Sequence, residues 1–266
     1  MVMQRIANPS TPVRFRPQPQ FKMNLHNSLH FKDTPMFVLC GGLGTRLRES
    51  LGGIPKSLAP VNDKPFMEFI LKHWVNNKVS HFVFLLGYKA ELIKDYLEQA
   101  NDTLFSDCKF QYVIEEERLG TGGSVANAIN VMNYSGNFFL INSDTWTSAT
   151  LENFWNAKPP CIGILFQEDT KRYGIVEVSE DNQVTSFKEK SISSNSGFIN
   201  SGLYLLNSKL FSDWDGNPCS IEEEYLTKFV KQQLLSGVNL ETSFIDIGVP
   251  KDYEYFKNNF IQITNE

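Results

Sequence analysis

The chain contains few of the residues that build disulfide frameworks, zinc sites or membrane spans. Its four cysteines lie far apart in 266 residues, and no two of them form a C-x-x-C pair. We therefore expect buried thiols in a reducing compartment, which favours a cytoplasmic location, for Cys40, Cys108, Cys161 and Cys219. No apolar run approaches the roughly 18 residues that a membrane span requires, and no secretory signal is present, so no membrane partner is expected.

Basic residues are also in deficit. Five of the 25 lysines and arginines fall within the first 32 residues, so the rest of the chain carries 20 basic residues against 30 acidic ones. Nucleic-acid binding depends on counterion release at a basic face, and an acidic body therefore argues against a nucleic-acid partner. The four histidines form no Ser/His/Asp or Cys/His arrangement, so the sequence indicates no catalytic triad.

The first 34 residues lack the apolar period of a helix or a strand. They contain four helix-breaking prolines, which are Pro9, Pro12, Pro17 and Pro19. We predict a disordered leader over residues 1–34 and a single domain over residues 35–262. The prolines disfavour an organellar transit peptide, which needs an amphipathic helix. Met36 opens the first predicted strand and would be the natural start if the leader is a misassigned extension.

From Met36 onward, short apolar runs alternate with stretches of helical period. Strands are predicted over residues 36–40, 81–86, 109–114 and 137–141, with helices over 64–77, 89–99 and 122–132 between them. This alternation is typical of βαβ units. With 41% hydrophobic and 13% aromatic residues, the chain can bury one substantial core. We predict an α/β fold with a doubly wound, mainly parallel sheet.

The pattern changes after Asp144. Strands near residues 161–167, 173–178 and 184–189 follow one another without helices, and a turn over 180–182 joins the last two. We predict an antiparallel insertion that covers a substrate. A strand over 198–206, a helix over 220–234, a short strand ending at Asp246 and a helix beginning at Pro250 complete the chain.

A glycine-rich loop directly follows the first predicted strand. It reads Leu39-Cys-Gly-Gly-Leu-Gly-Thr-Arg46, and Lys56 follows ten residues later. Such glycines let backbone N–H groups face phosphate oxygens, and the two cations supply positive charge. The string of a P-loop does not occur, and a dinucleotide fingerprint starting at Gly42 has Leu47 in place of its third glycine. A glycine-rich turn without a ligand stays as the alternative.

Two further motifs lie at predicted strand ends. Gly120-Thr-Gly-Gly opens a helix after Glu115-Glu-Glu117, and a helix N-terminus of this kind suits an anion. Of the three glutamates, the second and third are expected to be solvated. Asp144 and Asp246 each follow an apolar strand, and two such carboxylates are typical of a Mg²⁺ site, although one alone would more often cap a helix. No Lys or Arg neighbours either acid in sequence, so we expect activity to require a divalent cation.

These motifs, G-G-x-G-T-R-L followed by P-K, resemble the opening signature of the sugar nucleotidyltransferase family. The similarity extends from Met36 to about Phe260 and implies a Rossmann-like fold of GT-A type. It implies that Arg46 and Lys56 contact a triphosphate and stabilise the transition state. The resemblance implies nucleotide binding by Leu39, Gly41, Gly42, Gly44, Thr45, Glu115, Gly120 and Thr121. Arg118 stands where relatives often have proline, and Ser143 replaces the glycine of an N-G-D metal motif that would place Mg²⁺ on Asp144 and Asp246.

The insertion carries short elements that on the residues alone would be ordinary turns and a solvated pair. They are Tyr173-Gly174, Glu189-Lys190 and Asn200-Ser-Gly202. Because they resemble the Y-G, E-K and N-x-G elements of the family, they imply a sugar-phosphate site. In that site Glu189 and Asn200 would bind hydroxyls, Lys190 would meet the phosphate, and Gly174 would contribute backbone.

The resemblance implies that a nucleoside triphosphate and a sugar 1-phosphate give a nucleotide sugar and pyrophosphate. The chain looks most like guanylyltransferases that use GTP and D-glycero-α-D-manno-heptose 1-phosphate. Mannose-1-phosphate guanylyltransferases and amino-sugar uridylyltransferases share most of the signatures and stay open as alternatives. A non-catalytic nucleotide-sugar-binding subunit is disfavoured, because such relatives typically lose one of the charged residues that are all present here. A homo-oligomer is left open.

Overall fold

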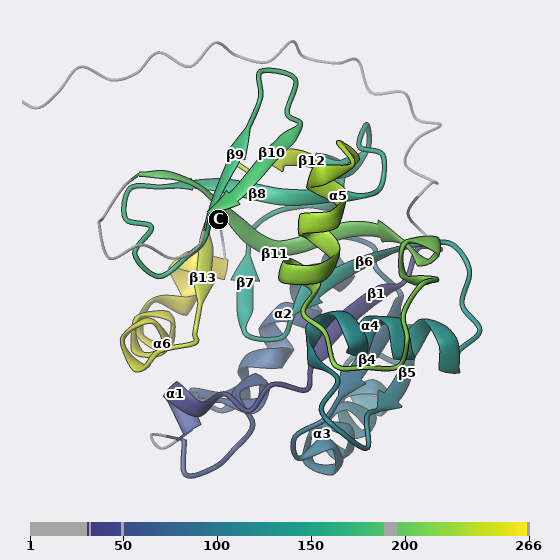
Figure 1. Cartoon of the computed structure of the whole chain (residues 1–266). Helices are drawn as coiled ribbons and strands as arrows, with labels where there is room; N and C mark the ends of the chain where they lie inside the picture. The colour runs from purple at the N-terminus through teal and green to yellow at the C-terminus, as the bar shows by residue number, and fades with distance from the viewer. Residues whose placement is uncertain (1–30, 32, 49–50, 189–195, 265–266) are drawn as a thin grey trace, which may run out of the picture.

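The computed structural model describes residues 31, 33–48, 51–188 and 196–264, so most of the expected leader, Glu189 and Lys190 lie outside the described residues. Its central feature is a run of four parallel strands in the order β6-β1-β4-β5 (Figure 1). These are β1 (Met36–Cys40), β4 (His81–Leu86), β5 (Lys109–Ile114) and β6 (Asn137–Asn142). The predicted doubly wound α/β fold with a mainly parallel centre is confirmed.

Antiparallel strands extend this sheet beyond β6. The long strand β11 (Gly197–Asn207) pairs with β6, with β8 (Cys161–Gln167) and with β9 (Ile175–Val178). β9 and β10 (Val184–Lys188) form an antiparallel hairpin that projects from the body (Figure 1). The predicted insertion is therefore continuous with the main sheet through β11. The strand β12 (Ser236–Asn239), which the sequence did not indicate, pairs in parallel with β8.

Helices cover both faces of the sheet. Neighbouring residues of β1 alternate between two clusters, with Met36 and Val38 in one and Phe37 in the other. The first cluster also buries residues of α2 (Phe66–Asn76), α3 (Ala90–Thr103) and α6 (Pro250–Thr264). The second buries residues of α4 (Gly120–Val131) and of the helical segment that follows residue 220. Both sides of the parallel strands are thus apolar, as expected for a sheet covered on both faces.

Several short elements escape periodicity arguments because two to six residues carry no measurable period. They include β7 (Thr145–Thr147) and the two-stranded sheet of β2 (Pro60–Val61) and β3 (Lys64–Pro65). The predicted short strand ending at Asp246 is present as β13 (Phe244–Asp246), and it pairs with β7. The helix expected over 220–234 is a π-helix over Ile221–Leu226 followed by α5 (Thr227–Lys231). A one-turn helix α1 (Thr45–Arg48) and 3₁₀ turns complete the described chain at Lys56–Leu58, Leu151–Phe154 and Ser208–Phe211.

The cysteines are free thiols. Cys40, Cys108 and Cys161 are buried as expected, whereas Cys219 is only half-buried. Burial raises the pKa of the Cys40 and Cys161 thiols to about 12, so both stay protonated at neutral pH. None of the helices in the described ranges is long and apolar enough to cross a membrane.

The first described residue already touches the core. The Phe31 ring meets Phe139 of β6 edge-on at 5.1 Å between centroids, and the Thr34 amide donates to the Phe31 carbonyl at 3.0 Å. Phe139 is fully buried on the face that packs against α2 and α6. An N-terminal deletion that removes Phe31 therefore removes an aromatic contact to the sheet.

We predict that deleting residues 1–30 leaves the melting temperature unchanged, whereas deleting residues 1–34 lowers the free energy of unfolding by about 1 kcal/mol, the typical contribution of an aromatic pair. Phe31→Ala in the full chain is the matched control and should reproduce most of that loss. Thermal melts of the three proteins measure the difference. Equal stability of the two deletion variants would show that the contact between Phe31 and Phe139 contributes nothing to the free energy of unfolding.

Candidate active site

Three predicted motifs converge because they follow parallel strands of one sheet. The glycine loop leaves β1, Glu115 follows β5, and Asp144 lies two residues beyond β6. The chain runs from β1 outward through β4 and β5 and then returns to the other side of β1 with β6. Such a reversal opens a crevice at the carboxyl ends of the strands, where open α/β sheets bind ligands. The Ser143 amide donates to the Leu39 carbonyl at 3.1 Å and fastens the two loops together.

The glycine loop brings its backbone close to the predicted catalytic lysine. Gly44 adopts a φ of +56°, and a Cβ there would lie 3.2 Å from Cβ of Lys56. Gly42 is exposed, and a Cβ there would meet nothing within 4 Å. Thr45 and Arg46 are also exposed, at the start of α1. The loop therefore leaves open space above Gly42, with Arg46 and Lys56 as its cations.

Glu115 points inward, between the glycine loop and the end of β4. A Cβ on Gly41 would lie 2.6 Å from Glu115 Oε1, and one on Gly87 would lie 2.5 Å from it. The Ser124 hydroxyl donates to the other carboxylate oxygen at 2.7 Å. Glycine at these two positions thus makes room for the carboxylate. Glu116 and Glu117 are exposed, in accord with the solvated positions expected of them.

The second glycine motif has a packing role that the sequence did not reveal. Gly120 has a φ of +71°, and a Cβ there would lie 2.4 Å from the Cys219 carbonyl oxygen. The amides of Gly122 and Gly123 donate to that same carbonyl at 2.9 and 3.3 Å. These two N–H groups are therefore already used, and the expected anion at this helix N-terminus would find neither of them available.

Thr121 connects the predicted nucleotide loop to the predicted sugar site. Its hydroxyl donates to Glu222 Oε2 at 3.1 Å and accepts from the Ile221 amide at 2.9 Å. Tyr204 donates to Glu222 Oε1 at 3.4 Å, and Asn200 Nδ2 donates to the Tyr204 hydroxyl at 2.8 Å. Burial raises the pKa of Tyr204 well above its ordinary value. A neutral, buried hydroxyl thus joins Glu222 to Asn200.

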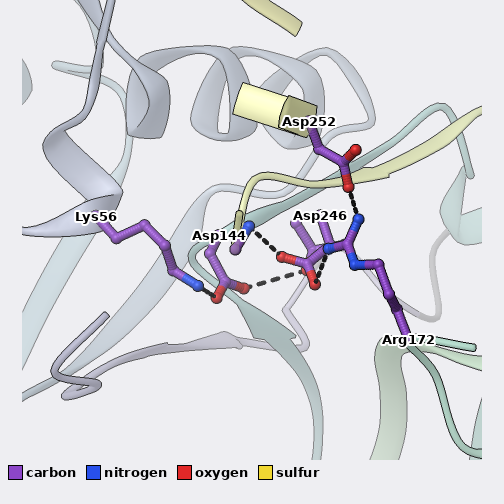
Figure 2. Close-up of polar contacts among 7 residues, drawn as sticks. Lys56, Asp144, Arg172, Asp246 and Asp252 are labelled. Atoms are coloured by element: carbon purple, nitrogen blue, oxygen red, sulfur yellow. Dashed lines mark hydrogen bonds and ion pairs between the residues drawn. The ribbon is translucent and has the colours of Figure 1, made fainter. Parts of the chain in front are cut away.

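The two predicted metal acids lie together because short strands pair. β13 pairs with β7 so that Asp246 faces Thr145, the residue after Asp144. Burial raises the pKa of Asp246, and the charge of Asp144 adds to the rise. Lys56 makes an ion pair with Asp144, and the Gly248 amide donates to Asp246 Oδ1 at 2.7 Å (Figure 2).

Arg172 is a site residue that sequence reasoning missed. It makes an ion pair with Asp252 in the first turn of α6, and its Nη2 lies 3.8 Å from Asp246 Oδ2 (Figure 2). The expectation that no cation neighbours the two acids holds along the sequence but is wrong in space, because Lys56 and Arg172 arrive from distant segments. Only the position of Arg172, directly before the Tyr173-Gly174 element, could have indicated it.

A cavity of about 770 Å³ opens beside these charges. Gly174 and Asn200, which were predicted to bind the sugar phosphate, line this cavity, as do Asp246 and Arg172. The sequence did not indicate several other lining residues, which include Asn142, Phe187, Tyr204, Glu222, Glu223 and Thr227. The predicted Glu189 and Lys190 follow β10 and lie outside the described residues.

The donor set of the acid pair fits a hard divalent cation. Within the described part of the chain, no group of three or more His, Cys, Asp or Glu residues could hold a metal. Asp144 and Asp246 alone would leave positions for water and phosphate oxygens, which is how Mg²⁺ is usually held beside a triphosphate. The carboxylates also require positive charge, since the proximity of Asp144 raises the pKa of Asp246.

Comparison with known proteins assigns the chain to a family. Residues 36–262 match the family described as nucleotidyl transferase. The chain belongs to the nucleotidyl transferase family.

Relatives of this transferase share most of its length. It is 36% identical over 223 residues to D-glycero-alpha-D-manno-heptose 1-phosphate guanylyltransferase of Campylobacter jejuni, covering 84% of this chain and 98% of that protein. Identity to the protein of the same name from Aneurinibacillus thermoaerophilus is 33%, over 81% and 94% of the two chains. The crystal structure of HddC from Yersinia pseudotuberculosis complexed with GMP-PN superposes with a TM-score of 0.74 at 32% identity, covering 85% and 99%.

We predict that the two glycine motifs of the transferase respond differently to alanine. Gly120→Ala should lower the free energy of unfolding by about 2 kcal/mol or more, because a Cβ meets backbone at a positive φ. Gly42→Ala should change it by less than about 0.5 kcal/mol, as at other open sites, yet weaken triphosphate binding. Thermal melts and nucleotide titrations separate the two effects. Unchanged nucleotide affinity in Gly42→Ala would favour a glycine turn that carries no ligand.

Proposed function

We propose that this sugar-1-phosphate nucleotidyltransferase transfers a guanylyl group from GTP to D-glycero-α-D-manno-heptose 1-phosphate. The names of the two relatives above and the GMP-PN complex of HddC support this choice. The observation that carries it is the inward carboxylate of Glu115, which lies beside Gly41 and Gly87. Residues 35–262 would form the single catalytic domain.

The preference for guanine follows from hydrogen-bond inventory. An ionised carboxylate only accepts hydrogen bonds, and its two oxygens can receive two parallel donors. Guanine offers such a pair in its N1–H and its exocyclic amine. Uracil and thymine present one N–H between two carbonyl acceptors, so their lone pairs would oppose those of Glu115. The Ser124 hydroxyl orients the carboxylate for this role.

The reaction is an in-line displacement in which an oxygen of the sugar phosphate bonds to the α-phosphorus of GTP and pyrophosphate leaves. A sugar phosphate is already an anionic nucleophile, so no side chain need remove a proton. Arg46 and Lys56 neutralise the triphosphate, and Gly41, Gly42, Gly44 and Thr45 present backbone groups to it. Leu39, Gly120 and Thr121 belong to the walls of the base site in this proposal.

Asp144 and Asp246 would hold Mg²⁺, which when bound supplies charge neutralisation at the reacting phosphates. Lys56 and Arg172 pair with these acids and place positive charge beside the same phosphates. Asn200 and Gly174 would contact the sugar in the cavity. Glu189 and Lys190, which lie outside the described residues, are proposed to bind a sugar hydroxyl and the sugar phosphate. The alternative sugars share this framework and differ in the hydroxyls that the cavity must accept.

The direct test is pyrophosphate release with GTP, UTP and dTTP, each paired with heptose, mannose and amino-sugar 1-phosphates. We expect the highest kcat/KM for GTP with the heptose phosphate. A higher value for mannose 1-phosphate or an amino-sugar phosphate would replace the proposed acceptor. No turnover with any pair would favour a nucleotide-sugar-binding protein without catalysis.

We predict that Glu115→Gln reduces the preference for GTP over UTP by about tenfold or more, the usual effect of one buried hydrogen-bond mismatch. The glutamine oxygen can still accept from Ser124, which leaves its NH₂ group for a pyrimidine carbonyl. Glu116→Gln removes the same charge from an exposed neighbour and should change nothing. If the wild type prefers UTP, or Glu115→Gln keeps its GTP preference, the base is read by other groups.

We predict that Asp144→Asn and Asp246→Asn each lower kcat on the order of a thousandfold and weaken Mn²⁺ binding, because two acids share one cation. Asp95→Asn, an exposed change on α3, is the control. Mn²⁺ titration followed by electron paramagnetic resonance measures binding without turnover. Wild-type Mn²⁺ affinity in both variants would contradict the proposed metal site.

A further inference from the structure

The cavity has an excess of negative charge. Three of its lining side chains are acids, which are Asp246, Glu222 and Glu223. Among the lining residues in the described ranges, Arg172 is the single lysine or arginine. A sugar 1-phosphate brings up to two more negative charges to this space. Like charges at such short range repel strongly where water is partly excluded, so the phosphate needs a cation beside it.

Arg172 has hydrogen-bond donors in reserve. A guanidinium carries five N–H donors in a planar fork that matches phosphate oxygens. One Nη of Arg172 is paired with Asp252, and the other lies 3.8 Å from Asp246, beyond hydrogen-bond distance. The Nε is buried and has no hydrogen-bond partner among the residues that the structure describes. The guanidinium is therefore hydrogen-bonded to Asp252 through one Nη, and its other Nη, which is only loosely paired with Asp246, can donate to a second anion.

The position of Arg172 is fixed by two neighbours, the carboxylate of Asp252 and the ring of Tyr173. The Asp252 carboxylate lies in the first turn of α6, where the helix dipole favours negative charge. The guanidinium carbon lies 5.4 Å from the Tyr173 ring centroid, and Tyr173 packs edge-on against Phe244 at 5.8 Å. These contacts hold the fork beside Asp246, the acid at which the reacting phosphates are expected to meet.

We propose that Arg172 is a second cation, beside the Lys190 of the proposed function, that receives the phosphate of the sugar 1-phosphate, and that Asp252 is the positioning residue that holds Arg172 in the cavity. The inference rests on the proposed function and names the acceptor contact within that same site. With a divalent cation held by Asp144 and Asp246, the Asp246 carboxylate would be neutralised by that cation, and the Arg172 guanidinium would be available to donate to a phosphate oxygen. The ion pair between Arg172 and Asp252 stays in place throughout.

The first experiment compares Arg172→Gln with wild type in steady-state kinetics and in calorimetric titration of the sugar 1-phosphate. We expect the KM and the Kd of the sugar phosphate to rise tenfold to about a hundredfold, the range of a charge-assisted hydrogen bond. The KM of GTP should stay within about twofold. Arg172→Lys keeps the charge without the fork and should fall between the two.

The matched control is Lys171→Gln, which removes the same charge from the adjacent, exposed position outside the cavity. It should bind the sugar phosphate as the wild type does. Asp252→Asn should raise the acceptor KM severalfold while leaving kcat at saturation nearly unchanged. In the Arg172→Gln background the same change should have no further effect, because Asp252 acts through Arg172.

The outcomes distinguish the proposed role of Arg172 from the proposed catalytic function. If the wild type turns over but Arg172→Gln behaves as Lys171→Gln, or only binds Mn²⁺ more tightly, Arg172 merely balances Asp246 and the inference is wrong. Additive effects of Asp252→Asn and Arg172→Gln would remove the positioning role. If no triphosphate is turned over but calorimetry shows sugar-phosphate binding that Arg172→Gln abolishes, the inference holds and the catalytic function fails. If the wild type shows neither turnover nor binding of the sugar phosphate, both the proposed function and the inference are wrong.

Discussion

Two carboxylates held side by side at a buried site need positive charge around them, and the rest of the site is arranged to supply it. Asp144 and Asp246 come from segments about a hundred residues apart, and the pairing of β7 with β13 brings them together. Burial and mutual repulsion raise the pKa of Asp246. Lys56 stands on one side and Arg172 on the other, so that positive and negative groups alternate from the glycine loop to α6 (Figure 2). A divalent cation and two phosphates would bind among these charged side chains by replacing the ion pairs between them.

Glycine serves two different purposes in the same crevice. At Gly41 and Gly87 the missing side chains leave room for the Glu115 carboxylate, which is proposed to read the base. At Gly120 a Cβ would strike the Cys219 carbonyl, so this glycine allows two segments to pack. The two roles of glycine cannot be told apart from the sequence, because the sequence shows that a side chain is missing but not which group fills the space.

The hydrogen bonds around Glu222 join the two halves of the proposed substrate site. Thr121, in the first turn of α4, is proposed to lie beside the base, and Asn200, on β11, is proposed to bind the sugar. Tyr204 stands between them, fully buried and uncharged. This network passes through the π-helix at residues 221–226, an uncommon element that often accompanies functional sites. The insertion and the nucleotide half are thus one continuous structure, as the shared strand β11 also shows.

The sequence by itself determined the fold class, the order of the main strands and the convergence of the three motifs. Apolar periods mark strands such as Met36–Cys40 and His81–Leu86, and parallel strands carry whatever follows them to one edge of the sheet. Only the tertiary structure decided the role of Arg172, the packing of Gly120 on Cys219 and the pairing of β7 with β13. These depend on contacts between segments that are distant in the chain and too short to carry a period. Local sequence patterns indicate which residues favour a helix or a strand. The tertiary arrangement of the sheet and its loops determines which charged side chains come into contact.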